Sequence, residues 1–151
     1  MPKRSVEFFM LDILVAIDTI QRHSATIKNS NDFAADETRY NVILRQLEII
    51  GEAMKQILEN KKLQTKPEWR DIVDFRNIVA HEYFGINVKE VFDIVKNEIP
   101  LLEKDFIALI KHHEDQEKLT KAFAGIKKDL ISIKRIDSIN YLEKIERSLR
   151  E

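Results

Sequence analysis

The chain of 151 residues is long enough to bury one hydrophobic core and short for two domains of ordinary size. Apolar residues make up 44% and charged residues 34% of it, with three glycines and three prolines, which excludes a disordered or loop-rich chain. It contains no cysteine, so disulfides, thiol catalysis and cysteine-ligated metals are excluded. A net charge of −1 excludes a strongly basic nucleic-acid-binding body, so any RNA contact must be local.

The first helical pattern begins near the N-terminus, where basic residues precede apolar ones as in a signal peptide. Glu7, Asp12 and Asp18 interrupt the apolar part, and no small-residue cleavage site follows, which favours an amphipathic core helix. No apolar run approaches the roughly 20 residues that span a bilayer. We therefore expect a cytoplasmic protein without a membrane partner.

Two helices are predicted in the first 60 residues. Apolar residues recur at steps of three and four along residues 4–28 and again along residues 37–60. The polar residues 29–37 are expected to form a loop, with Asp36 as the N-cap of the second helix. Gly51 lies in the middle of that helix, where glycine costs about 1 kcal/mol relative to alanine, so we expect another helix to approach closely there.

Two more helices are predicted between residues 65 and 113. Thr65 opens a capping-box spacing and should cap a third helix, which Gly85 should stop. Asn87 should cap a fourth helix over residues 88–113, with a kink or break just before Pro100 because proline lacks a backbone N–H.

The last segment, residues 115–151, is charged but keeps the helical spacing of apolar residues. With no strand-like alternation elsewhere, we predict an all-α fold: an antiparallel helical bundle, residues 1–114, with a helical C-terminal extension. Basic residues in the extension either contact RNA phosphates or form a solvated helical face; these are Lys127, Lys128, Lys134 and Arg135.

The segment RNIVAHEYF, residues 76–84, concentrates polar chemistry within nine residues. The guanidinium of Arg76 is a permanent cation suited to gripping a phosphate, and His81 can move protons near neutral pH. Together they suffice for metal-free cleavage of RNA, with the histidine assisting attack by the 2′-hydroxyl and the arginine stabilising charge on phosphorus oxygens. No cofactor is expected.

The spacing of these residues leaves their arrangement open. On a straight helix, Arg76 and His81 diverge by roughly 140°. Either the helix ends or distorts near His81, or two copies of the chain complete one site, which requires a homodimer. An ordinary helix surface is the alternative, with Arg76 paired to Asp71, Asp74 or Glu82.

The pattern Arg-Asn-x-x-x-His-x-Tyr resembles the signature of HEPN-domain ribonucleases, in particular the HepT-like toxins. Further segments resemble that family in the same order: LDILVAIDTI, LEIIGEAMKQI, KPEWRDIVDFRNIVAHEYF and INVKEVFDIVKNEIPLLEKDF. The resemblance covers roughly residues 5–112. It implies that Arg76 and His81 are catalytic, that Asn77 supports them, and that two chains face each other across one cleft.

The resemblance also implies a partner. In HepT toxins, a nucleotidyltransferase antitoxin of the MntA type transfers AMP to a tyrosine that matches Tyr83, which would block RNA phosphate from Arg76. The alternative is an inactive HEPN module that docks a nucleotidyltransferase. A metal site at His112 and His113 is not expected, because adjacent helical side chains diverge and no spaced histidine accompanies them.

Overall fold

The computed structural model describes residues 4–81 and 85–151, and the side chains of residues 80 and 81 lie outside that description. Within these residues the chain is an all-helical bundle without strands, which confirms the predicted fold class. The helices are α1 (Val6–Ser24), α2 (Ser30–Ala35), α3 (Glu37–Leu58), α4 (Trp69–His81), α5 (Val88–Asp93), η2 (Ile94–Glu98), α6 (Ile99–Lys111), α7 (Gln116–Ser132) and α8 (Ile136–Ser148).

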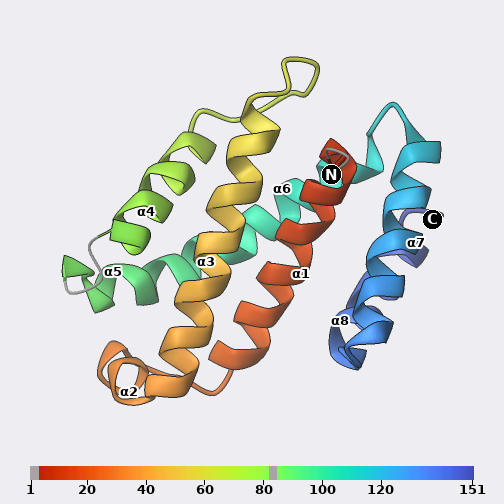
Figure 1. Cartoon of the computed structure of the whole chain (residues 1–151). Helices are drawn as coiled ribbons and strands as arrows, with labels where there is room; N and C mark the ends of the chain where they lie inside the picture. Colours follow the sequence, from red (N-terminus) through yellow and green to blue (C-terminus); the bar gives the residue numbers. More distant parts are fainter. Residues whose placement is uncertain (1–3, 82–84) are drawn as a thin grey trace.

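Helices α1 and α3 lie antiparallel at the centre of the bundle, with α4 beside α3 on one side (Figure 1). Their apolar stripes form much of the core, which includes Met10, Ile13, Leu14, Ile17, Ile43, Ile50, Met54 and Ile57, each fully buried. The predicted N-cap of α3 is confirmed, because the Asp36 side chain accepts a hydrogen bond from the Arg39 amide at 3.1 Å.

The predicted loop over residues 29–37 is wrong, because most of it forms the short helix α2. The Asn29 side chain caps this helix by accepting a hydrogen bond from the Asp32 amide at 2.8 Å. Phe33 is buried and packs edge-on against Tyr40 at 5.0 Å between ring centroids. The buried Phe33 ring therefore stabilises a short helix that the polar local sequence did not predict.

The predicted start of the third helix at Thr65 is also wrong. Helix α4 begins at Trp69, after a turn in which the Trp69 amide donates to the Lys66 carbonyl at 3.1 Å. Trp69 is buried and packs on Phe106, with 4.9 Å between ring centroids. The first residue of α4 is therefore already part of the hydrophobic core.

The predicted break before Pro100 is confirmed as a π-helical turn, η2, between α5 and α6. The Ile99 amide donates to the Ile94 carbonyl, five residues earlier, so the chain gains a wide turn before the residue that has no N–H to donate. The predicted cap at Asn87 is confirmed by hydrogen bonds from the amides of Lys89 and Glu90.

The C-terminal extension forms a hairpin of α7 and α8 that packs on α1, on the side away from α4 (Figure 1). Gly125 lets α7 approach closely, because a Cβ there would lie 2.7 Å from the Phe8 Cζ. The Tyr141 hydroxyl donates to Glu103 of α6 at 2.7 Å. The extension is helical, as predicted, and it is docked on the body rather than separate from it.

Gly51 marks the close approach between α3 and α4 that the sequence predicted. A Cβ at residue 51 would lie 2.7 Å from the Arg76 Cγ and closer still to the Arg76 Cβ. Since glycine costs helix stability, its place here is explained by the space that the Arg76 side chain occupies.

Candidate active site

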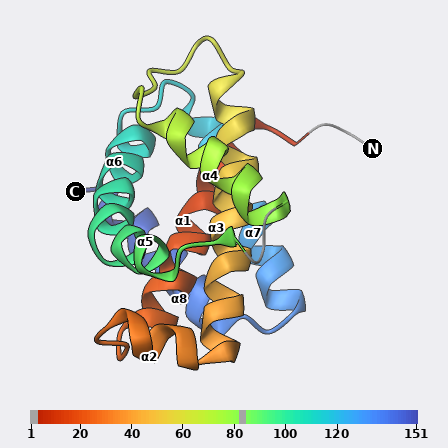
Figure 2. The ribbon, with the colours of Figure 1, turned by 90° about the vertical axis from the view of Figure 1, so that its left-hand side faces the viewer.

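The candidate site lies on α4, which crosses in front of α3 in Figure 2. Arg76 is half-buried there, with 26% of its side chain exposed. Its Nη2 donates to the Glu52 carboxylate of α3 at 2.7 Å, and its Nη1 donates to the Asn77 side-chain oxygen at 3.0 Å. The guanidinium is therefore held at both ends while part of it faces solvent.

These contacts test two of the three pairings that the sequence left open for Arg76, because the third candidate partner, Glu82, lies outside the described residues. Within the part of the chain that the structure describes, Arg76 pairs with neither Asp71 nor Asp74, and its partner is Glu52 of another helix. Sequence reasoning missed Glu52 because acidic residues are frequent in this chain. The signal that points to it is its place directly after Gly51, where an approaching helix was expected.

The remaining candidate residues are only partly described. Asn77 is exposed and lies beside Arg76. His81 is the last residue of α4 as described, and its side chain, like Tyr83, lies outside the described residues. The meeting of Arg76 and His81 at one site, within one chain or across two, therefore stays a prediction.

A shallow pocket of about 530 Å³ adjoins Arg76 and is bounded by α1 and α3. It is lined by cations and anions together, including Arg4, Lys55, Asp12 and Glu52. Arg4 forms an ion pair with Asp12 at 2.8 Å. Burial raises the pKa of the Asp12 carboxyl, and the positive charge of Arg4 partly opposes this rise. The surface around Arg76 is thus a mixture of apolar and charged groups, with cations and anions in nearly equal number.

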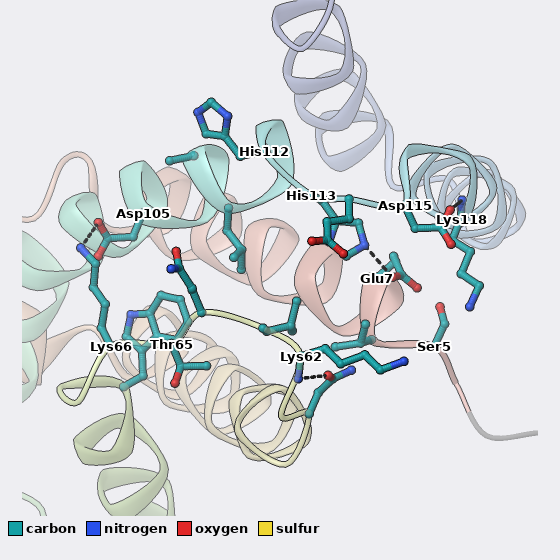
Figure 3. A pocket seen from close by; sticks show the side chains of 18 residues that line it. Ser5, Glu7, Lys62, Thr65, Lys66, Asp105, His112, His113, Asp115 and Lys118 are labelled. Atoms are coloured by element: carbon teal, nitrogen blue, oxygen red, sulfur yellow. Dashed lines mark hydrogen bonds and ion pairs between the residues drawn. The ribbon is translucent and has the colours of Figure 1, made fainter.

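A larger pocket, of about 990 Å³, lies away from Arg76, between the α3–α4 loop and the junction of α6 and α7 (Figure 3). Two pairs of its lining side chains already bind each other. Lys66 forms an ion pair with Asp105, and the His113 Nε2 lies 2.7 Å from the Glu7 carboxylate, where both side chains are almost fully buried. This pairing assigns His113 to the packing of α1 against the α6–α7 junction.

The two adjacent histidines follow the end of α6 at Lys111, outside the helix in which the sequence placed them, and they point in different directions in Figure 3. His112 is exposed, whereas His113 turns toward Glu7. No group of three or more potential metal ligands occurs among the described side chains. Nor does any helix in the described ranges have the length and apolar character needed to cross a bilayer.

The basic residues of the extension are in part engaged. The Lys127 ammonium forms an ion pair with Glu146 of α8 at 2.8 Å, with about a quarter or less of each side chain exposed. This contact joins the two helices of the hairpin. For Lys127, the structure favours the packing role over an RNA contact.

Comparison with known proteins identifies the family. The model of the family described as "Ribonuclease HepT-like" matches residues 13–109, which contain α4 and the complete Arg-Asn-x-x-x-His-x-Tyr motif. The chain belongs to the HepT-like ribonuclease family. The expected enzyme class, a ribonuclease, is confirmed at this level.

Several curated proteins are similar to this chain. The protein of Thermococcus cleftensis named "Probable ribonuclease HepT" is 36% identical over 110 residues, which cover 72% of this chain and 99% of that protein. Two proteins of Methanocaldococcus jannaschii whose names carry the word RNase are 32% and 35% identical, over 78% and 70% of this chain and 98% and 96% of their own lengths. No solved structure matches the chain.

The HepT-like match ends before the extension. Residues 115–151, which form α7 and α8, lie beyond the matched range. The 110 residues aligned with the Thermococcus cleftensis protein cover 99% of that protein and 72% of this chain, so this chain is the longer of the two. A domain boundary at residue 114 stays a prediction.

Proposed function

We propose that this HepT-like protein is a metal-independent endoribonuclease and the toxin of a HEPN–nucleotidyltransferase toxin–antitoxin pair, acting in the cytoplasm as a homodimer. The observation that carries the proposal is the held but partly exposed guanidinium of Arg76 within the family motif. Residues 1–114 form the nuclease bundle, and residues 115–151 form an accessory hairpin.

In the proposed reaction, the 2′-oxygen of a ribose attacks the adjacent phosphorus and the 5′-oxygen of the next nucleotide leaves. The products are a 2′,3′-cyclic phosphate and a 5′-hydroxyl end. His81 takes the proton from the 2′-hydroxyl or delivers one to the leaving oxygen. Arg76 stabilises the negative charge that gathers on the non-bridging phosphate oxygens.

Regulation by a nucleotidyltransferase antitoxin completes the proposal. The Tyr83 oxygen attacks the α-phosphorus of ATP, pyrophosphate leaves, and AMP stays on the tyrosine. The added phosphate brings negative charge two residues from His81 and seven residues from Arg76 along the chain, which disfavours RNA at this site. The motif supports this assignment through the position of its tyrosine.

The test is RNA cleavage by the purified protein in the presence of EDTA. Arg76→Ala and His81→Ala should each lose at least about 100-fold in rate, since each removes a group that acts in the transition state. Arg70→Ala, on the same helix, and His112→Ala, on an exposed ring, are matched controls that should cleave like wild type. Cleavage that persists in both motif variants would refute the proposed site.

The cleavage assay also distinguishes the proposed nuclease from the alternative, an inactive module that docks a nucleotidyltransferase. A HEPN module without nuclease activity would bind a nucleotidyltransferase tightly, leave RNA intact and be harmless when expressed alone. A toxin should instead arrest growth when expressed alone, and arrest should disappear in His81→Ala.

A further inference from the structure

The guanidinium of Arg76 is tied to the body of the protein through one residue of α3. Asn77, its other partner, follows Arg76 directly on α4 and moves with the same backbone. Glu52 belongs to a different helix, and its carboxylate accepts from the Arg76 Nη2 at 2.7 Å. Within the described residues, therefore, Glu52 fixes the guanidinium relative to α3.

The rest of the Arg76 side chain adds no other polar anchor. Its Nε–H is buried and makes no hydrogen bond among the described residues. Its Cβ and Cγ occupy the space that a Cβ at residue 51 would need. This packing positions the start of the side chain but leaves its outer torsions free. The direction in which the Nη groups point thus depends on Glu52.

Glu52 is itself accessible, with 51% of its side chain exposed. An ion pair as exposed as this one contributes little to folding, so its removal should leave the bundle intact. The Glu52 carboxylate, however, lies beside the guanidinium that an RNA phosphate would bind. The carboxylate and the phosphate are both negative and repel each other. Glu52 therefore has opposite effects on orienting the arginine and on binding RNA.

We infer that Glu52 is a positioning residue for RNA cleavage: it holds Arg76 in the reactive orientation at the expense of some affinity for RNA. The inference rests on the proposed function, because it assigns Arg76 to the scissile phosphate. It adds a residue of α3 to a site that the motif confines to residues 76–83.

The kinetic test compares two substitutions at residue 52. Glu52→Ala removes both acceptor and charge, so kcat should fall about 10- to 100-fold, as expected for a misplaced catalytic group, while KM for RNA falls. Glu52→Gln keeps an oxygen acceptor within reach and removes only the charge. It should recover most of the kcat and retain the lower KM.

The matched control is Glu48→Ala, one turn earlier on α3, where the glutamate pairs with Arg45 at 3.2 Å. It should leave kcat and KM unchanged. Equal loss of kcat in Glu52→Ala and Glu52→Gln, or an unchanged kcat in Glu52→Ala, would overturn the inference. A thermal melt of each variant checks that the bundle is folded.

A second measurement needs no RNA. Side-chain ¹⁵N relaxation of the Arg76 guanidinium in the free protein should show increased motion in Glu52→Ala and wild-type order in Glu48→Ala. An equally ordered guanidinium in all three proteins would overturn the positioning role. This result does not depend on cleavage. A wild-type protein that cuts no RNA would refute the proposed function, while the relaxation data would still decide whether Glu52 holds the Arg76 guanidinium in place.

Discussion

Gly51 of α3 and Arg76 of α4 lie so close that residue 51 has no room for a side chain. An added Cβ would sit 2.7 Å from the Arg76 Cγ and closer to the Arg76 Cβ, which is fixed to the backbone and cannot rotate away. One contact therefore both packs α3 against α4 and positions the candidate catalytic arginine.

The first prediction concerns this contact. Gly51→Ala should lower the free energy of unfolding by about 1–2 kcal/mol, because the gain in helix propensity is smaller than the cost of the overpacked methyl group. The melting temperature should drop by roughly 2–8 °C. RNA cleavage should also fall, since Arg76 must shift.

Gly125→Ala is the matched comparison for Gly51→Ala. Its Cβ would meet the end of the Phe8 ring, at 2.7 Å from Cζ, on the face of α1 that the extension covers. A folded Gly125→Ala protein should cleave RNA like wild type. If Gly51→Ala retained full stability and activity, the contact would have no role in the site.

The second prediction tests whether the site is composite. In a symmetric dimer with Arg76 from one chain and His81 from the other, a heterodimer of Arg76→Ala and His81→Ala chains has one intact site and one that lacks both groups. Mixing the two inactive variants under conditions of subunit exchange should restore cleavage to about half of wild type per heterodimer. An inactive mixture would place Arg76 and His81 of the same chain at each site.

The third prediction concerns Tyr83. Incubation with a cognate nucleotidyltransferase and ATP should raise the mass of the peptide that contains residues 76–84 by one AMP unit, and cleavage of RNA should stop. Tyr83→Phe lacks the attacking oxygen and should show no mass change under the same conditions. An unmodified tyrosine in the wild-type peptide would remove AMP transfer from the proposed mechanism.

The fourth prediction follows from the half-buried carboxyl of Asp12, which lines the smaller pocket together with Arg76. Burial raises its pKa above the ordinary 3.8, so the folded protein binds this proton more tightly than the unfolded chain does. The stabilisation by the bound proton is present below that ordinary value and is lost as pH rises through the folded-state pKa.

Asp12→Asn imitates the protonated acid and keeps an oxygen acceptor for Arg4. The variant should therefore become progressively more stable than wild type as pH rises above 3.8, and the difference should level off once the folded-state carboxyl is ionised. Urea unfolding of both proteins across this range measures the effect. A difference that shrinks with rising pH would contradict it.

The sequence alone determined most helices of the bundle, and it predicts the residues of the candidate site. Periodic apolar residues specify α1 and α3, the side chains of Asp36 and Asn87 cap the helices that follow them, and the tight spacing at Gly51 anticipated a close neighbour. These are local properties, set by residues within a few positions of one another. The motif from Arg76 to Tyr83 is local in the same sense.

Only the tertiary structure decided which groups from distant segments meet. The segment around Phe33 is helical although its local sequence is polar, because the Phe33 ring is buried and packs against other aromatic rings. Glu52 reaches Arg76, 24 residues away, and the extension docks on α1 through Gly125 and Phe8. Such pairings depend on how helices pack, and helix packing is set by the shape of whole surfaces rather than by the spacing of any one segment.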